Sequence, residues 1–419
     1  MDKIIQTLNK VNWDFSDYNS SKYPLDINSI PWYPATFPAP IPKYLIALLS
    51  NKEDFILDPF GGKGTTIFEA IKQDRNCIYN DINPFAKDIV KSLIECIKQA
   101  AKDKSYISRI IENDRTFLKQ FKRSDRNDIY TSEEINENHH YDIFIKELEL
   151  IKGEELSLEI FYWFHIDTLR ELCNIYNIIV QSDENEKSIR KAAFVSILKE
   201  TCSQRGHFTY VTDNCRPKKI KYYNAVQSYL SMLERLNMAT IEFLKQFDSL
   251  NQPKNILDIL DKIIINEGDA RSLEWLKNNS IDLVITSPPY LCAQDYTKTM
   301  RLINFFFPSD RFNKAANCEI GPRSQRRRKA TLIVKNFYDD LKKVFSEVYR
   351  VLKNDKIFCL VIGQGSGKIT DEYNTIHDIN EIIINEIGFK KIFSTIRNIS
   401  HKSIRIGGVS TEEIIIFKK

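Results

Sequence analysis

The most chemically specific feature of the chain is the tetrapeptide Ser287-Pro288-Pro289-Tyr290, which follows the apolar run 281–286. That run predicts a buried strand, which would deliver the tetrapeptide to one edge of a sheet. Proline fixes φ at about −65° and has no N–H, so the carbonyls of Ser287 and Pro288 are aimed in fixed directions. A serine oxygen and a carbonyl can accept both hydrogens of an exocyclic amine, and the Tyr290 ring offers a stacking face for a planar base. The competing interpretation is an ordinary strand-ending turn, where Pro and Ser are common.

A glycine-rich loop ends a second apolar stretch. Residues 54–66 read as a strand that runs into this loop, and a helix over 67–71 follows. Gly62 and Gly64 allow close approach of a ligand to the backbone, and a helix N-terminus favours a polar or anionic group. Asp81 ends the next strand, 19 residues beyond Gly62, where a nucleotide-binding fold places an acid for ribose hydroxyls. This order of elements predicts a nucleoside site.

Two other glycine-loop chemistries fail on spacing. A phosphate-binding P-loop requires Gly-x4-Gly-Lys-Ser/Thr, but Leu57 stands at the first glycine position and Gly64 follows the lysine. A dinucleotide fingerprint requires Gly-x-Gly-x-x-Gly, but Ile67 stands at the third glycine position. A dehydrogenase would also leave the Ser-Pro-Pro-Tyr motif without a role.

Together these motifs resemble those of the S-adenosylmethionine-dependent DNA methyltransferases that act on an exocyclic amino group. Residues 58–66 resemble the Asp-Pro-Phe-x-Gly-x-Gly-Thr-Thr cofactor loop of that family, and residues 81–84 resemble its second motif. Residues 33–42 are similar to the segment that closes over the methionine part of the cofactor. Residues 268–270 are similar to the third motif, and residues 286–290 are similar to the catalytic motif.

The resemblance implies S-adenosylmethionine as the cofactor, with no metal. It places Asp81 on the ribose, Ile82 beside the adenine, and Asp269 or its backbone near the adenine amine. A helix cap for Asp81 and a turn for Asp269 are the alternatives. The implied catalytic residues are Ser287, Pro288, Pro289 and Tyr290, and the implied cofactor-binding residues are Phe37, Asp58, Phe60, Gly62, Gly64, Thr65, Thr66, Asp81, Ile82, Asp269 and Ala270.

The first residue of the catalytic motif bears on the target base. Within this family, serine there usually goes with cytosine-N4 methylation, and aspartate more often goes with adenine-N6. Ser287 therefore favours a sequence-specific enzyme that methylates cytosine N4 in double-stranded DNA, within a restriction-modification system that has a cognate endonuclease. The alternatives are an adenine-N6 DNA methyltransferase, an RNA amino-methyltransferase and a catalytically idle DNA-binding protein.

Two basic segments are candidates for DNA contact. Residues 323–329 form a basic run free of acids, and residues 205–223 interleave basic with aromatic side chains. Such residues suit phosphate contact and base stacking, although an ordinary solvated surface is the alternative for both. The expected DNA-binding residues are Arg205, Arg216, Lys218, Lys219, Arg323, Arg326, Arg327, Arg328 and Lys329.

Composition fits this interpretation. The chain has 419 residues, so it is long enough for a large core plus an added domain, and its net charge of +4 permits nucleic-acid binding without requiring it. The eight cysteines include no Cys-x-x-Cys pair, which argues against a zinc site and a disulfide framework. A reduced, cytoplasmic setting is therefore expected. We expect no membrane association, because there is no signal peptide and no apolar run of spanning length.

The elements that must position these residues predict an α/β fold. We expect a Rossmann-like seven-stranded methyltransferase sheet with an inserted, mainly helical subdomain. Residues 1–99 would hold an N-terminal lead-in and the first half of the methyltransferase domain, residues 100–256 the insertion with possible target-recognition elements, and residues 257–419 the second half. Helices are predicted at 64–73, 84–98 and 335–352, and strands at 54–58, 77–81, 263–267, 282–286, 357–362, 390–397 and 413–417.

The resemblance also implies two features of the sheet that the residues do not show by themselves. The last strand is expected to be antiparallel. The strands that end in the cofactor loop and in Ser-Pro-Pro-Tyr are expected to be neighbours, because ligands of open α/β sheets sit outside the carboxyl ends of the strands.

Overall fold

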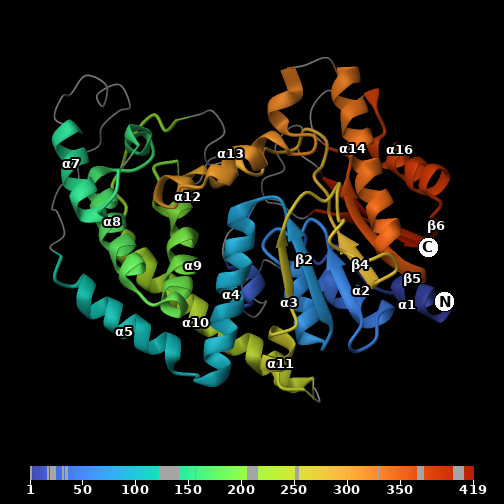
Figure 1. The fold of residues 1–419 in the computed structure, drawn as a ribbon, viewed down its shortest axis with the longest axis horizontal. Helices are drawn as coiled ribbons and strands as arrows, with labels where there is room; N and C mark the ends of the chain where they lie inside the picture. The colour runs from blue at the N-terminus through green and yellow to red at the C-terminus, as the bar shows by residue number, and fades with distance from the viewer. Residues whose placement is uncertain are drawn as a thin grey trace.

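The computed structural model describes residues 2–16, 18, 25–30, 33, 36–121, 141–155, 157–204, 216–250, 254–327, 330–365, 372–399 and 410–419. A single sheet forms its centre, and Figure 1 shows a group of helices beyond α4 on one side of that sheet. The strands are β1 Phe55–Asp58, β2 Asn76–Asp81, β3 Ile264–Glu267, β4 Ile281–Thr286, β5 Leu352–Gly363, β6 Lys390–Asn398 and β7 Thr411–Lys418.

The α-helices alternate with the strands at both ends of the chain and follow one another between β2 and β3. They are α1 Asp2–Leu8, α2 Pro40–Leu49, α3 Thr65–Lys72, α4 Pro84–Lys102, α5 Tyr106–Leu118, α7 Tyr141–Lys152, α8 Ile166–Gln181, α9 Glu184–Thr201, α10 Ala225–Ser249, α11 Ile256–Leu260, α12 Arg301–Phe306, α13 Asp310–Asn317, α14 Ala330–Val351 and α16 Thr375–Glu381. The short 3-10 helices are η1 Ile27–Ser29, η2 Leu158–Tyr162, η3 Lys298–Met300 and η4 Arg323–Arg327, and η5 Ile382–Ile387 is a π-helix.

The sheet has the order β3-β2-β1-β4-β5-β7-β6. β3, β2, β1, β4 and β5 run parallel to one another, and β7 is antiparallel to both β5 and β6. The seven predicted strands and the antiparallel last strand are confirmed. The strand order reverses between β1 and β4, and the crevice beside such a switch point is where open α/β sheets bind ligands.

The middle portions of β4 and β5 are apolar because both faces of the sheet are covered there. All six residues of β4 are buried. In β5, Ile357, Cys359 and Val361 join the core on the face covered by α2, α3 and α4. The intervening Phe358, Leu360 and Ile362 join the core on the face covered by α14 and α16.

The helix α14 covers that second face with one apolar stripe. It begins at Ala330 rather than at the predicted residue 335. Ile333 and Val334 are both buried, so they extend the stripe of Phe337 and Leu341 by another turn.

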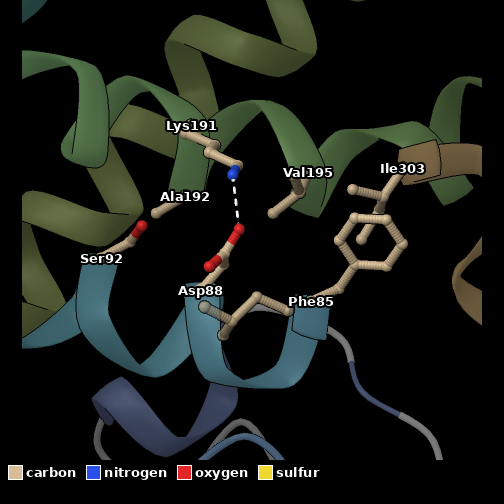
Figure 2. Close-up of a pocket in the computed structure, with 8 residues that line it drawn as sticks. Phe85, Asp88, Ser92, Lys191, Ala192, Val195 and Ile303 are labelled. Carbon is tan, nitrogen blue, oxygen red and sulfur yellow. Dashed lines mark hydrogen bonds and ion pairs between the residues drawn. The ribbon is translucent and has the colours of Figure 1, made fainter. Parts of the chain in front are cut away.

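The helices between β2 and β3 pack on the outer side of α4, as Figure 1 shows. A buried ion pair ties three of them together. Asp114 of α5 accepts hydrogen bonds from Arg190 of α9 at 2.8–3.0 Å and from the Tyr229 hydroxyl of α10 at 2.8 Å. At the seam with α4, Asp88 pairs with Lys191 at 2.8 Å (Figure 2). A small pocket there is lined by Phe85, Asp88, Ile89, Ser92, Lys191, Ala192, Val195 and Ile303.

The N-terminal segment is part of the packed structure. Leu8, Trp13 and Ile27 are buried in the same core as α2 and α3. The backbone carbonyl of Trp13 accepts a hydrogen bond from Arg397 Nε at 3.1 Å, which docks the segment on β6.

Candidate functional site

The two loops predicted to do chemistry lie at the same edge of the sheet. β1 pairs in parallel with β4, with Ile56 opposite Leu283 and Leu57 opposite Val284. The cofactor loop therefore leaves the sheet beside Ser287, as the family resemblance implied. Adjacent parallel strands place their carboxyl ends together, so a donor held by one loop and an acceptor held by the other would meet here.

Asp58 joins these two loops directly. Its carboxylate is buried and accepts hydrogen bonds from Thr66 Oγ1 and Thr286 Oγ1, each at 2.7 Å, and from the Phe60 N–H at 3.1 Å. Burial raises the pKa of Asp58 to about 6, against the three donors, which favour the charged form. These contacts position Asp58 as a support for both loops.

The glycines of the cofactor loop are required by its geometry. Gly62 and Gly64 have φ values of +49° and +88°, in the left-handed region that favours glycine. A Cβ on Gly61 would overlap the Tyr79 ring, and the Tyr79 hydroxyl donates to the Gly62 carbonyl at 2.7 Å. The ring of Tyr33 also lies close to the loop, 3.3 Å from where a Cβ of Gly62 would stand. The loop thus packs against two tyrosines.

Asp81 braces the same loop from β2. One carboxylate oxygen accepts the Gly62 N–H and the other accepts the Asn83 N–H, both at 2.8 Å. Burial raises the pKa of Asp81 to about 6. The helix-cap alternative for Asp81 is wrong, because the Asn83 side chain caps α4 by accepting the Phe85 N–H. Each oxygen of Asp81 keeps a lone pair for a further donor such as a ribose hydroxyl.

Asn80 is a supporting residue that sequence reasoning missed. Its side chain is fully buried and donates to the carbonyls of Pro59 at 3.1 Å and Gly268 at 2.9 Å. It thereby joins the loops that follow β1 and β3. The only signal in the sequence was a polar residue inside an apolar strand.

The remaining predicted cofactor residues lie around these loops. Asp269 binds Arg271 through both carboxylate oxygens at 2.6–3.0 Å, so its side chain is already engaged. Thr65, Thr66 and Ala270 are buried, and Phe37, Phe60 and Ile82 are half-buried.

The catalytic motif is held by a partner from the far end of the chain. Ser287 Oγ lies 3.3 Å from the Tyr290 hydroxyl, which donates to Glu412 Oε1 at 2.8 Å. Glu412 forms an ion pair with Arg397. Sequence reasoning missed both charged residues, because β6 and β7 read only as strands. Tyr290 is 8% exposed, so a base can stack on its ring only if neighbouring groups move aside.

The segment that follows the catalytic motif contains a half-buried carboxylate, Glu319. Glu319 accepts the backbone N–H groups of Tyr296, at 3.1 Å, and Thr297. Burial raises the pKa of Glu319 to about 7. Nearby, Asp295 Oδ2 and Gln294 Nε2 are buried and have no hydrogen-bond partner among the described residues.

The predicted DNA-binding residues are described only in part. Lys218 and Lys219 are exposed, and the Arg216 guanidinium lies 3.8 Å from the centre of the half-buried Tyr162 ring. Arg323 is half-buried and begins η4. Outside the described residues or side chains lie Arg205, Arg326, Arg327, Arg328 and Lys329.

Neither a metal cluster nor a membrane-spanning helix occurs among the described residues. No group of three or more His, Cys, Asp or Glu side chains there is arranged to hold a metal ion. Among the helices in the same part of the chain, none is both long and apolar enough to cross a membrane.

One protein-family model matches the two parts of the chain that contain the cofactor loop and the catalytic motif. A family model described as DNA methylase, of the N6/N4 methyltransferase type, matches residues 4–92 and 281–419, more than half of the chain. The helices between β2 and β3 lie almost entirely in the unmatched stretch.

Individual proteins show the same likeness. The type II methyltransferase M.MjaII of Methanocaldococcus jannaschii is 25% identical over 84% of this chain and 75% of its own length. The type II methyltransferase M.MvaI of Kocuria varians is 24% identical over 92% of this chain and 89% of its own. A Thermus thermophilus protein solved with S-adenosyl-L-methionine is 21% identical, covering 36% of this chain and 53% of its own, with a TM-score of 0.23.

Proposed function

Because the chain belongs to the N6/N4 DNA methylase family, we propose that it methylates the exocyclic N4 amine of cytosine in double-stranded DNA. We further propose that it acts at a specific sequence as the modification partner of a restriction endonuclease. The observation that carries the proposal is Ser287, rather than an aspartate, at the edge of the sheet beside the cofactor loop.

The cofactor is S-adenosylmethionine, and the residues present fit it. The positive φ values of Gly62 and Gly64 allow the tight turn of the loop, and each oxygen of Asp81 keeps a lone pair beside the Gly62 amide. A nucleoside with a ribose diol suits these groups. When bound, S-adenosylmethionine supplies a methyl group on a sulfonium, and the sulfur keeps the electron pair of the broken bond as the amine nitrogen bonds to the methyl carbon.

The protein's part in the reaction is positioning. The target base must leave the duplex, because its amine cannot be approached in line while the base is stacked. Ser287 Oγ and the Pro288 carbonyl accept the two amine hydrogens and draw the nitrogen lone pair out of conjugation with the ring. Tyr290 stacks on the base once its face is uncovered. Orientation of this kind can supply about 7–11 kcal/mol of the barrier reduction.

No strong base is needed before attack. The amine becomes cationic as the new bond forms and then loses its proton easily. A serine hydroxyl is a poor base, so Ser287 fits a role as hydrogen-bond acceptor.

The DNA would lie across the edge that carries these loops. The exposed Lys218 and Lys219 suit phosphate contact, and so does Arg323, which begins η4 after the catalytic motif. Phosphate contacts fix the register of a duplex but do not read its sequence.

The test is methyl transfer from labelled S-adenosylmethionine to mixed-sequence duplex DNA and to RNA, followed by nucleoside analysis. We expect N4-methylcytosine in DNA, and we expect Ser287→Ala to abolish it while cofactor binding stays intact. N6-methyladenine would overturn the assignment of the base. Label confined to RNA would overturn the assignment of the substrate. Absence of label in every nucleic acid, with cofactor bound, would indicate either that the substrates lack the recognition site or that the chain is an idle DNA-binding protein.

A further inference from the structure

The catalytic serine stands at one end of a continuous series of polar contacts. Ser287 Oγ lies 3.3 Å from the Tyr290 hydroxyl, and that hydroxyl donates to Glu412 Oε1 at 2.8 Å. Glu412 Oε2 pairs with Arg397, and Arg397 Nε donates to the Trp13 carbonyl at 3.1 Å. The series therefore joins the catalytic loop, β7, β6 and the N-terminal segment.

The ion pair in this series is shielded from solvent. The Arg397 side chain is 4% exposed and the Glu412 side chain 11%. An arginine stays protonated in proteins, and its ion pair with Glu412 favours the ionised carboxylate. An ionised carboxylate can only accept hydrogen bonds. Tyr290 must therefore be the donor to Glu412. Burial and the charge of Glu412 hold the pKa of Tyr290 well above its usual value, so the hydroxyl keeps its proton.

This donor assignment fixes the next contact as well. A tyrosine hydroxyl has one hydrogen, and in Tyr290 that hydrogen is committed to Glu412. Tyr290 can then offer only a lone pair to Ser287, so the Ser287 hydroxyl must donate to Tyr290. With its own hydrogen used, Ser287 Oγ presents only lone pairs to any third group.

We propose that Glu412 is a positioning residue that fixes the direction of the Tyr290–Ser287 hydrogen bond and so makes Ser287 an obligate acceptor for the target amine. This inference rests on the proposed function, in which Ser287 receives an amine hydrogen. The fixed bond direction also lets the site distinguish a base that carries an amine from one that carries a carbonyl oxygen. A base that presents an amine is accepted, whereas a base with a carbonyl oxygen at that position meets lone pairs on both Ser287 and the Pro288 carbonyl and is rejected.

The test compares single-turnover methylation rates at saturating S-adenosylmethionine and saturating mixed-sequence duplex DNA. Glu412→Gln keeps the size of the side chain but can donate to Tyr290, so it permits the reversed bond direction. Tyr290→Phe keeps the ring and removes the hydroxyl. Glu413→Gln is the matched control, because it removes the same charge from the next position of β7, whose side chain points to the other face of the sheet.

We expect Glu412→Gln and Tyr290→Phe each to lower the rate constant about 10- to 100-fold, the range seen when an outer residue that orients a metal ligand is removed. The dissociation constant for S-adenosylhomocysteine should change less than twofold, and Glu413→Gln should match the wild type in both measurements. The double variant should be no slower than Tyr290→Phe alone, because Glu412 acts through the hydroxyl that this change removes.

Two results would overturn the inference. One is a Glu412→Gln rate within twofold of the wild type. The other is a double variant in which the two losses multiply, since that would indicate a general structural role for Glu412. If Glu412→Gln does not fold, Tyr290→Phe decides the matter alone, and a wild-type rate for it overturns the inference. Failure of the proposed function looks different, because the wild-type protein itself would then form no N4-methylcytosine in DNA.

Discussion

Asp58 at the end of β1 accepts a 2.7 Å hydrogen bond from Thr286 Oγ1 at the end of β4, although the two residues are 228 positions apart in the chain. The second oxygen of Asp58 accepts Thr66 Oγ1, also at 2.7 Å. One buried carboxylate thus sets the distance between the cofactor loop and the residue that precedes Ser287. Asp58 is therefore part of the cofactor loop and also holds that loop at a fixed distance from the catalytic motif.

The two threonines should be energetically coupled through Asp58. Thr66→Val and Thr286→Val each remove one hydrogen bond to a buried carboxylate, and each should cost about 1.5–3 kcal/mol of unfolding free energy. Because they share a partner, the double variant should deviate from additivity by more than about 0.5 kcal/mol. Urea denaturation of the four proteins measures this. Strict additivity would mean that Asp58 does not connect the two loops.

A methyl group at Gly61 should disable cofactor binding. The Cβ of Gly61→Ala would overlap the buried Tyr79 ring, and Tyr79 also holds the Gly62 carbonyl. The ring would have to move and take the loop with it. We expect at least a tenfold weaker affinity for S-adenosylhomocysteine by calorimetry. Tyr79→Phe is the control, since it loses the hydroxyl but keeps the ring, and it should weaken binding less. Equal affinities for Gly61→Ala and the wild type would contradict this account of the loop.

Stability should fall with rising pH because of Glu319. Burial raises its pKa from 4.5 to about 7, so between these values the folded state binds more protons than the unfolded state. The stabilisation is complete below about pH 4.5 and is lost as the pH rises through 7. Glu319→Gln cannot ionise, so it isolates this effect. Relative to that variant, the wild type should lose about 1–3 kcal/mol of unfolding free energy between pH 5 and pH 8. Parallel pH profiles for the two proteins would show that Glu319 does not titrate in this window.

The exposed lysines before α10 should contribute to DNA binding. Lys218→Ala with Lys219→Ala removes two charges that suit phosphate contact. The slope of log affinity against log salt should fall by about 0.9 for each phosphate that is no longer neutralised, and binding should weaken equally for all sequences. Lys390→Ala with Lys391→Ala is the charge-matched control, because both lysines are exposed where β6 starts, opposite the end of β7. Equal salt slopes for the two double variants would show that the region before α10 does not contact DNA.

The motifs and the elements that carry them could be predicted from the amino-acid sequence alone. Ser287–Tyr290, the glycines of the cofactor loop and Asp81 were readable because their chemistry depends on short spacings. Central strands such as β4 and β5 were readable because a strand buried on both faces carries a continuous apolar run. The start of α14 was predicted about a turn too late, because the apolar stripe begins before residue 335.

How these motifs and elements contact one another could be seen only in the folded structure. Nothing in the spacing of residues shows that β1 lies beside β4, that Asn80 reaches Gly268, or that Glu412 holds Tyr290 from 122 positions away. Such contacts depend on strand order and on which side chains a closed core leaves facing one another. A polar residue in a strand looks the same in sequence whether it faces solvent or a buried partner. Its partner exists only once the distant strands have paired, and that pairing is a property of the whole fold.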